Sequence, residues 1–297
     1  MIDIVLYLIY FITGLIAGVV GGLLGTGGCS IMMPVIRFGF NFPSAIAVGT
    51  TLTAVVFTAA SGAYQNIKIH NMDKKSALWV GIPGILGVII GSILFGYIIN
   101  YGDIIDLIIG LAFILVAVRM LYEGLKGLLI TKDKDTAVGI IEEKIKEKIS
   151  PDGGQIVRPV AQAQTTKQAP AVMPGSNAQK GVLGVVIGVL TGIIGLGGGY
   201  ALVPSFIYLF KSPVKLAMGT SMAAFVWMAL VGAIFKLYQG VVNIPVAVVL
   251  GIGAVIGAIY GVKLMSKIHP DYLKSLFGVL FLYVSLKYIL FYFGIYI

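Results

Sequence analysis

Residues 14–28 read GLIAGVVGGLLGTGG, and residues 184–198 read GVVIGVLTGIIGLGG. Six glycines of the first stretch, all except Gly21, coincide with glycines of the second at an offset of 170 residues, and the correspondence continues without a gap over residues 14–91 and 184–261. This repeated unit is far longer than the roughly 20–50 residues of solenoid repeats. It indicates a chain built from two long, apolar halves punctuated by glycine, an organisation found in many transporters.

The composition is that of an integral membrane protein. Mean hydropathy is +1.00, 58% of the residues are hydrophobic and 11% are charged, which leaves too little charge to cover a soluble protein of this length. The net charge of +9 comes from lysines between apolar runs, so it indicates membrane topology and not a nucleic-acid partner. The single cysteine, Cys29, excludes an internal disulfide, and without a Cys/His cluster we expect neither a metal nor a cofactor.

Eight apolar runs are long enough to cross a hydrocarbon core of roughly 30 Å. They cover residues 3–25, 43–67, 76–100, 103–125, 181–198, 214–238, 244–265 and 275–295. Two further runs, 28–40 and 199–210, are too short to cross, and each follows a glycine cluster and contains a proline. We therefore predict an all-α membrane protein, an inverted-repeat transporter with about eight full spans and two short broken or re-entrant helices.

Residues 126–180 separate the two halves and differ sharply from them. Acids and bases alternate over residues 132–148, and Gln, Pro, Gly and Ala dominate residues 151–180, a composition typical of a flexible linker. A ligand-sensing domain is the less favoured alternative, because aromatic residues are few. We predict a first membrane repeat over residues 1–125, a polar cytoplasmic linker over 126–180 and a second membrane repeat over 181–297.

The placement of lysines predicts how each half is oriented, because positive charge collects on the cytoplasmic side of a membrane. Loop 66–76 carries three lysines and its counterpart 239–244 carries none, whereas loop 40–44 carries none and its counterpart 211–215 carries two. Such an exchange is expected of repeats inserted in opposite directions. Both termini would then lie outside the cell and the linker inside. Lys236 fits less well, since this topology puts it near the outer face.

The glycines at four-residue spacing, such as Gly14, Gly18 and Gly22, lie on one helix face and allow another backbone to approach closely. We interpret them as internal helix packing. The alternative is that they pair two copies of the chain in a homo-oligomer.

The glycine clusters 25–28 and 195–199 carry the most specific functional signal. Glycines this dense disfavour a regular helix, and irregular backbone at membrane depth is tolerated only where protein buries it or where it lines a water-filled cavity. The short helix after each cluster begins with unpaired N–H groups and a positive dipole end, which suits an anion. A nucleotide-binding loop is excluded because no strand and no Lys-Ser/Thr pair accompanies the glycines. A tight turn at the membrane surface is the purely structural alternative.

Hydroxyl residues follow the glycine clusters in both copies, in Gly49-Thr50-Thr51 and Gly219-Thr220-Ser221. These hydroxyls either cap carbonyls of their own helix or donate to an oxyanion. Cys29, directly after the first cluster, is either a small filler or a contact for a sulfur-containing substrate.

The charged residues of the spans all lie near the predicted ends: Arg37, Asp106, Arg119, Glu123, Lys236 and Lys287. We therefore expect no mid-membrane carboxylate for proton relay and no buried lysine or arginine that clamps an anion. The spans also lack a catalytic acid, base or nucleophile pair, so we do not expect an enzyme, and a membrane-embedded enzyme or assembly factor is disfavoured.

The two copies together carry a recognisable pattern. It comprises residues 192–199 (GIIGLGGG), Pro204 and 217–221 (AMGTS), matched by 22–28 (GLLGTGG), Pro34 and 48–51 (VGTT). This pattern resembles the sulfite exporter TauE/SafE family, from which the chain departs by Cys29 in place of a third glycine. The resemblance implies a transporter in the cell membrane, in contact with the lipid bilayer, that exports sulfite, organosulfonates or related small sulfur-containing anions. A channel-like anion conduit, or a transporter of another small anion, shares these features. The predicted anion-binding residues are Gly25, Thr26, Gly27, Gly28, Cys29, Thr50, Thr51, Gly195, Gly197, Gly198, Gly199, Thr220 and Ser221.

Overall fold

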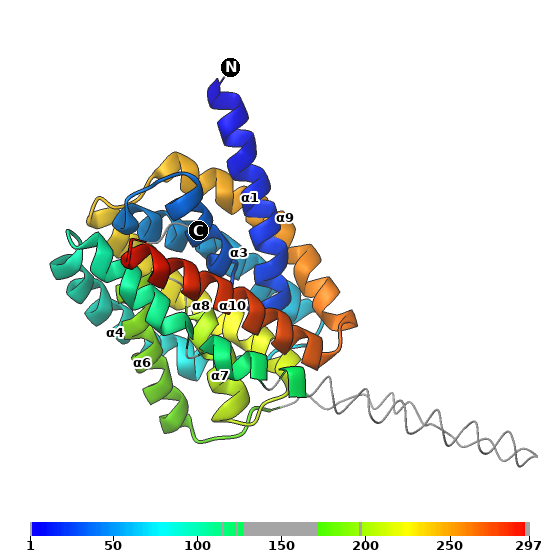
Figure 1. The fold of residues 1–297 in the computed structure, drawn as a ribbon. Helices are drawn as coiled ribbons and strands as arrows, with labels where there is room; N and C mark the ends of the chain where they lie inside the picture. The colour runs from blue at the N-terminus through cyan, green and yellow to red at the C-terminus, as the bar shows by residue number, and fades with distance from the viewer. Residues whose placement is uncertain (1, 115, 123, 127–171, 196–197, 295–297) are drawn as a thin grey trace, which may run out of the picture.

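The computed structural model of the chain describes residues 2–114, 116–122, 124–126, 172–195 and 198–294 (Figure 1). Within these ranges every regular element is a helix, and eight helices are long and apolar enough to span a membrane. They are α1 (Ile2–Leu24), α3 (Ser44–Lys68), α4 (Lys74–Ile98), the helix Gly102–Lys126, α6 (Asn177–Ile194), α8 (Val214–Tyr238), α9 (Ile244–Lys267) and α10 (Pro270–Tyr292). The predicted all-α membrane class is confirmed. Most of the predicted linker, residues 127–171, lies outside the described residues.

Two short helices follow the glycine clusters, as the sequence predicts. The first is α2 (Cys29–Pro34), which continues as the π-helical turn η1 (Val35–Gly39), and the second is α7 (Gly199–Tyr208). At about 1.5 Å per residue neither could cross a hydrocarbon core. Pro34 cannot donate a backbone hydrogen bond, and the π turn begins at the next residue.

The two copies pack on each other in a reciprocal way. Glycines of α1 lie against the backbone of α9, and the equivalent glycines of α6 lie against the backbone of α4, as the pairing of these helices in Figure 1 shows. A Cβ on Gly14, Gly18 or Gly22 would collide with Leu250, Ala254 or Ala258, and one on Gly184, Gly188 or Gly192 with Val80, Gly84 or Val88. Each contact in the first set has a counterpart in the second, in which both residues are replaced by those 170 positions away. The glycine faces thus serve internal packing, because only glycine lets these backbones meet.

Helices α3 and α8 form the centre of the bundle. They pack on each other, α3 also packs on α9, and α8 packs on α4. In both α3 and α8, 61% of the most apolar stretch is buried inside the protein. The corresponding share for α1 is 28%. The Gly-Thr-Thr and Gly-Thr-Ser motifs are carried by these two central helices, so the fold places both motifs inside the protein.

Candidate functional site

The first glycine cluster ends α1 and turns the chain into α2. Gly25, Gly27 and Gly28 all have positive φ, between 73° and 82°, a conformation that glycine adopts without steric cost. The amides of Thr26 and Gly27 donate to the carbonyl of Gly21, so they satisfy the end of α1 and are not free for a ligand. In the second copy Gly195, with φ of 67°, ends α6, while Gly197 lies outside the described residues.

The two glycine clusters meet in the centre of the protein. A Cβ on Gly199 would lie 2.6 Å from Cα of Thr26 and 2.9 Å from the carbonyl oxygen of Gly25. The same carbonyl accepts a hydrogen bond of 2.9 Å from the Ser221 hydroxyl. The first cluster therefore neighbours both the second cluster and the Gly-Thr-Ser motif of α8, although Gly25 and Ser221 are 196 positions apart in the chain.

Several buried hydroxyls near this meeting point lack a hydrogen-bond partner among the described residues. They are Thr26 Oγ1, Ser30 Oγ, Thr51 Oγ1 and Tyr200 Oη. Thr26 belongs to the first cluster, Ser30 and Tyr200 occupy equivalent positions in the first turns of α2 and α7, and Thr51 is the counterpart of Ser221. A buried hydroxyl without a partner is costly, so these four hydroxyls are candidates to contact a polar ligand.

The hydroxyls of Thr50 and Thr220 have a structural task in addition to the predicted one. Thr50 Oγ1 accepts the backbone N–H of Asn243 at 2.9 Å, and Thr220 Oγ1 accepts that of Asp73 at 3.0 Å. Asn243 and Asp73 are the N-cap residues of α9 and α4. Each threonine of one copy thus supports a helix start in the other copy, and its own hydroxyl hydrogen is still able to donate.

Cys29 lies inside the protein and is not exposed. Its thiol donates to the carbonyl of Thr26 at 3.3 Å, and its Cα follows the left-handed Gly28 directly. Cys29 therefore packs beside the meeting point of the clusters, which fits both of the roles considered for it. Among the described residues no three His, Cys, Asp or Glu side chains are grouped as metal ligands would be.

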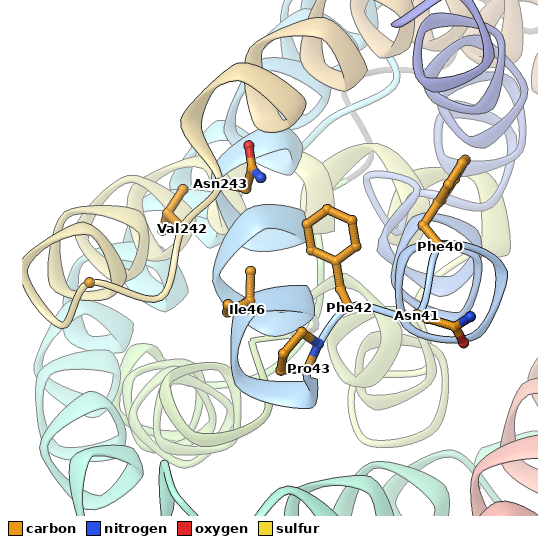
Figure 2. Close-up of a pocket in the computed structure, with 8 residues that line it drawn as sticks. Phe40, Asn41, Phe42, Pro43, Ile46, Val242 and Asn243 are labelled. Atoms are coloured by element: carbon orange, nitrogen blue, oxygen red, sulfur yellow. The ribbon is translucent and has the colours of Figure 1, made fainter. Parts of the chain in front are cut away.

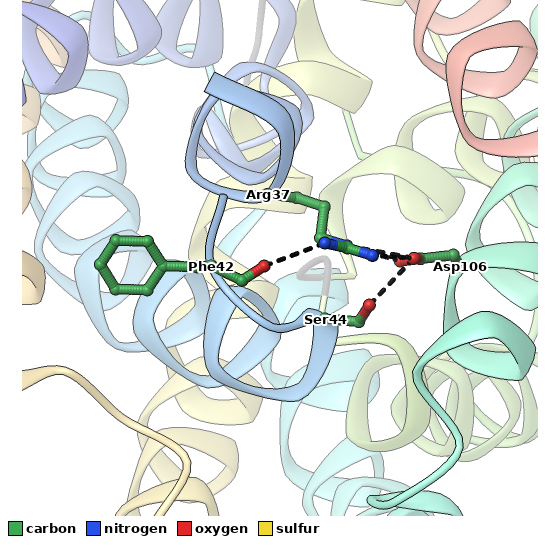
Figure 3. Close-up of polar contacts among 4 residues, drawn as sticks. All are labelled: Arg37, Phe42, Ser44 and Asp106. Carbon is green, nitrogen blue, oxygen red and sulfur yellow. Dashed lines mark hydrogen bonds and ion pairs between the residues drawn. The ribbon is translucent and has the colours of Figure 1, made fainter. Parts of the chain in front are cut away.

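The sequence missed a buried ion pair at the turn between η1 and α3. The guanidinium of Arg37 donates to Asp106 Oδ2 at 2.8 Å from Nη2 and to the carbonyl of Phe42 at 3.1 Å from Nη1 (Figure 3). The hydroxyl of Ser44, in the first turn of α3, donates to the same carboxylate oxygen at 2.9 Å. The Asp106 side chain is not exposed at all, and that of Arg37 is 15% exposed. A position near the end of a span does not determine burial here, because the helix Gly102–Lys126 starts against this turn.

A second buried cation also contradicts the sequence-based expectation that the spans lack one. Lys236, in the last turn of α8, is fully buried, and its Nζ has no hydrogen-bond partner among the described residues. The amine lies 3.0 Å from the centroid of the Phe95 ring on α4. The lysine residue in α8 was visible in the sequence, but its place near the end of the apolar run led to the prediction that it lies at the membrane surface.

An open pocket of about 400 Å³ lies between two turns of the chain, the one that leads into α3 and the one that joins α8 to α9. Figure 2 shows the side chains of both turns around it, among them Phe40, Phe42 and Asn243. None of the predicted anion-binding residues lines this pocket. The N-termini of α3 and α9 both border it, so their positive dipole ends face the same space.

The equivalent turn of the other copy, between α3 and α4, holds a bridge to the residues before α6. Asp73 Oδ2 accepts the backbone N–H of Met173 at 2.9 Å, and Lys180 Nζ donates to the carbonyl of Met173 at 2.8 Å. Burial acts to raise the pKa of the Asp73 carboxyl, but hydrogen bonds from Ser76 and Met173 and the charge of Lys180 outweigh it, so the pKa is lowered. The carboxylate is therefore stabilised in its ionised form.

Comparison with known proteins places nearly the whole chain in one group. The family model described as sulfite exporter TauE/SafE matches residues 10–288. A probable membrane transporter protein of Methanocaldococcus jannaschii is 26% identical over 295 residues, which covers 93% of this chain and 94% of that relative. The probable membrane transporter protein YunE of Bacillus subtilis is 26% identical over 290 residues, which covers 94% and 96% of the two chains. No solved structure matches the chain.

Proposed function

Because the chain belongs to the sulfite exporter TauE/SafE family of membrane transporters, we propose that it exports small sulfur-containing anions such as sulfite or organosulfonates. The eight apolar spans found among the described residues make it a multi-pass integral protein of the plasma membrane. Transport by a family of this kind requires a site that binds the anion within the bilayer and releases it again on the other side.

The observation that carries this proposal is the meeting of the two glycine clusters. In the first turns of α2 and α7, the N–H groups of Ile31 and Ala201 donate to the carbonyls of Gly28 and Gly198. Those of Cys29, Ser30, Gly199 and Tyr200 have no backbone partner among the described residues, and the helix dipoles add partial positive charge at these ends. The unpartnered hydroxyls of Thr26, Thr51 and Tyr200 supply further donors. Donors without a fixed cation favour an anion at low desolvation cost, which suits a carrier that must also release its substrate.

The proposed binding residues are those predicted from the sequence, with Ser30 and Tyr200 added from their place in the structure. Thr50, Thr220 and Ser221 act from the second layer, because their oxygens already take part in hydrogen bonds to the protein. Gly25, Gly28, Gly198 and Gly199 provide close backbone approach.

The proposed mechanism uses the two copies in opposite orientations, with the termini outside and residues 126–180 inside the cell. The exchange of lysines between equivalent loops supports this topology. The reciprocal packing of α1 on α9 and of α6 on α4 is what two related repeats require to alternate access around a central site. Impermeant thiol labelling of single cysteines in intact cells, on a Cys29→Ser background, tests the topology. Labelling of a cysteine placed at residue 160 from outside would contradict it.

The proposal is tested by flux into proteoliposomes, with sulfite, sulfate, thiosulfate and taurine as substrates. We expect saturable uptake of at least one sulfur-containing anion, whereas a channel would conduct without saturation. In Gly199→Ala, the added methyl group would push against Thr26 at 2.6 Å, so transport should fall by tenfold or more. The matched control is Gly39→Ala in η1, where the nearest atom to a new Cβ is 3.6 Å away. Equal flux in the two variants would contradict the assignment of the site.

A further inference from the structure

Lys236 lies in a group of residues that bury polar atoms without a hydrogen-bond partner among the described residues. Ser92 and Phe95 lie one turn apart on α4, and Lys236 and Gln239 lie one turn apart at the end of α8. The two helices bring Phe95 to the amine of Lys236, and Gln239 Nε2 donates to the carbonyl of Ser92 at 2.6 Å. These contacts place all four residues in one layer between α4 and α8.

Three atoms of this layer are buried and without a hydrogen-bond partner among the described residues: Ser92 Oγ, Lys236 Nζ and Gln239 Oε1. Each buried polar atom without a partner lowers the stability of the fold. A buried amine that faces only an aromatic ring lacks the counter-charge that usually accompanies it. In membrane proteins, ionisable residues inside the bundle commonly mark the path of a substrate or ion.

The other copy of the repeat has no such layer. The counterparts of Ser92, Phe95 and Gln239 are Val262, Met265 and Ile69. The counterpart of Lys236 is Asn66, whose amide donates to the carbonyl of Gly62 at 2.8 Å and accepts from Asn71 at 3.2 Å. The other copy thus has one polar side chain in this layer, which is uncharged and hydrogen-bonded, and apolar residues at the other three positions. The cluster formed by Ser92, Lys236 and Gln239 is a specific addition to one half of the protein.

The cluster adjoins both a functional motif and an open pocket. The carbonyl of Lys236 accepts the backbone N–H of Val241 at 3.2 Å, and Gly49, which begins the Gly-Thr-Thr motif, packs against the carbonyl of Val241. The turn that continues from Gln239 through Gly240 to Asn243 forms one wall of the pocket of about 400 Å³ in Figure 2. The pocket is therefore separated from Lys236 by only a few residues of chain, although Ser92, Lys236 and Gln239 do not themselves line it.

We propose that Ser92, Lys236 and Gln239 form a binding site for a small oxyanion at one end of the transport path, with Lys236 as its counter-charge. The inference rests on the proposed function and adds to it, because this site is separate from the glycine clusters. An oxyanion would accept hydrogen bonds from the ammonium and the hydroxyl, and from the amide of Gln239 once that side chain turns from Ser92. The asymmetry of the cluster gives this end of the path a stronger hold on the anion than the other end.

The test uses the full-length protein in detergent and in proteoliposomes, with sulfite, sulfate, thiosulfate and taurine as probes. Lys236→Met keeps an unbranched side chain that is one atom shorter and removes the charge. We expect it to raise the half-saturating concentration of the transported anion by tenfold or more and to abolish the anion-induced rise in melting temperature. Its melting temperature without anion should equal or exceed that of the wild type, because an unpartnered amine has been removed. The matched control is Lys263→Met, an exposed lysine that also lies near an aromatic ring, and it should behave like the wild type.

Two further variants keep the inference falsifiable if Lys236→Met does not fold. Lys236→Arg should retain anion dependence because it keeps the charge, and Ser92→Ala should weaken it severalfold. If the wild type binds none of the four probes, the proposed function fails. If the wild type binds one of them, and Lys236→Met or Ser92→Ala binds it equally well, only this inference is overturned.

Discussion

Replacing Thr220 by valine tests how the two copies support each other. Valine conserves the shape of threonine but cannot accept the backbone N–H of Asp73, which the Thr220 hydroxyl accepts at 3.0 Å. Thr220 is fully buried, as is most of Asp73, so this N–H would be left without a partner. Such a loss costs about 1–3 kcal/mol, which corresponds to a fall in melting temperature of roughly 2–4 °C per kcal/mol for a protein of this size. Thr50→Val should cost a similar amount, because Thr50 makes the equivalent bond to Asn243 at 2.9 Å.

The chain supplies its own reporter for this measurement. Cys29 is the only cysteine and is fully buried, so a thiol-reactive fluorogenic dye reacts when the core opens on heating. Thr53→Val is the matched control, since the Thr53 hydroxyl donates only to the carbonyl of Gly49 in its own helix. It should stay within about 0.5 kcal/mol of the wild type. An unchanged melting temperature in Thr220→Val, together with weaker anion binding, would refute the structural role. It would indicate instead that the Thr220 hydroxyl binds the anion.

Two further predictions concern charged groups that the fold buries. Asp106→Asn leaves Arg37 without its counter-charge and should lower the free energy of unfolding by about 3–5 kcal/mol. The double variant Arg37→Met with Asp106→Leu should recover most of this stability. A double variant no more stable than the single one would contradict this prediction. Asp73→Asn should keep the cap of α4, as Asn243 does for α9, but lose the stabilisation that comes from the lowered pKa of Asp73. That stabilisation is present above the ordinary carboxyl pKa of 3.8 and is lost as the pH falls through the lowered value. The melting temperatures of wild type and Asp73→Asn should therefore differ at pH 7 and converge as the pH falls below 4, whereas parallel curves would contradict the assignment.

Local pattern was enough to predict the helices, because each apolar run is long and is bounded by loop residues. The starts of α6 and α10 are where this prediction was least accurate, since α10 begins at Pro270 and not at residue 275. The earlier of these two runs was expected to begin at residue 181, but α6 begins at Asn177, after a capping box formed by Ser176 and Gln179. These polar residues resemble the linker in composition, although their reciprocal hydrogen bonds start the helix.

The repeat also predicted which glycines matter, since glycine spacing is a property of the chain itself. Glycines at every fourth residue can only present one face, so close helix packing followed from the sequence. Which helix each glycine face packs against could not be predicted, because the sequence does not say whether α1 packs within its own half or on the other half. The structure pairs α1 with α9 and α6 with α4, an exchange that depends on the path of the whole chain.

The sequence by itself determined the membrane class, the spans, the short helices and the glycine clusters, because hydropathy and backbone freedom are local properties. Only the tertiary structure decided which polar groups are buried and which of them have partners. Lys236 and Asp106 occupy similar places near the ends of apolar helices. Asp106 is held by Arg37 and Ser44, while Lys236 lies against Phe95 and has no hydrogen-bond partner in the part of the chain that the structure describes. The difference arises from neighbours that are distant in the chain, and the energy of a buried charge depends on those neighbours and not on its own position in the sequence.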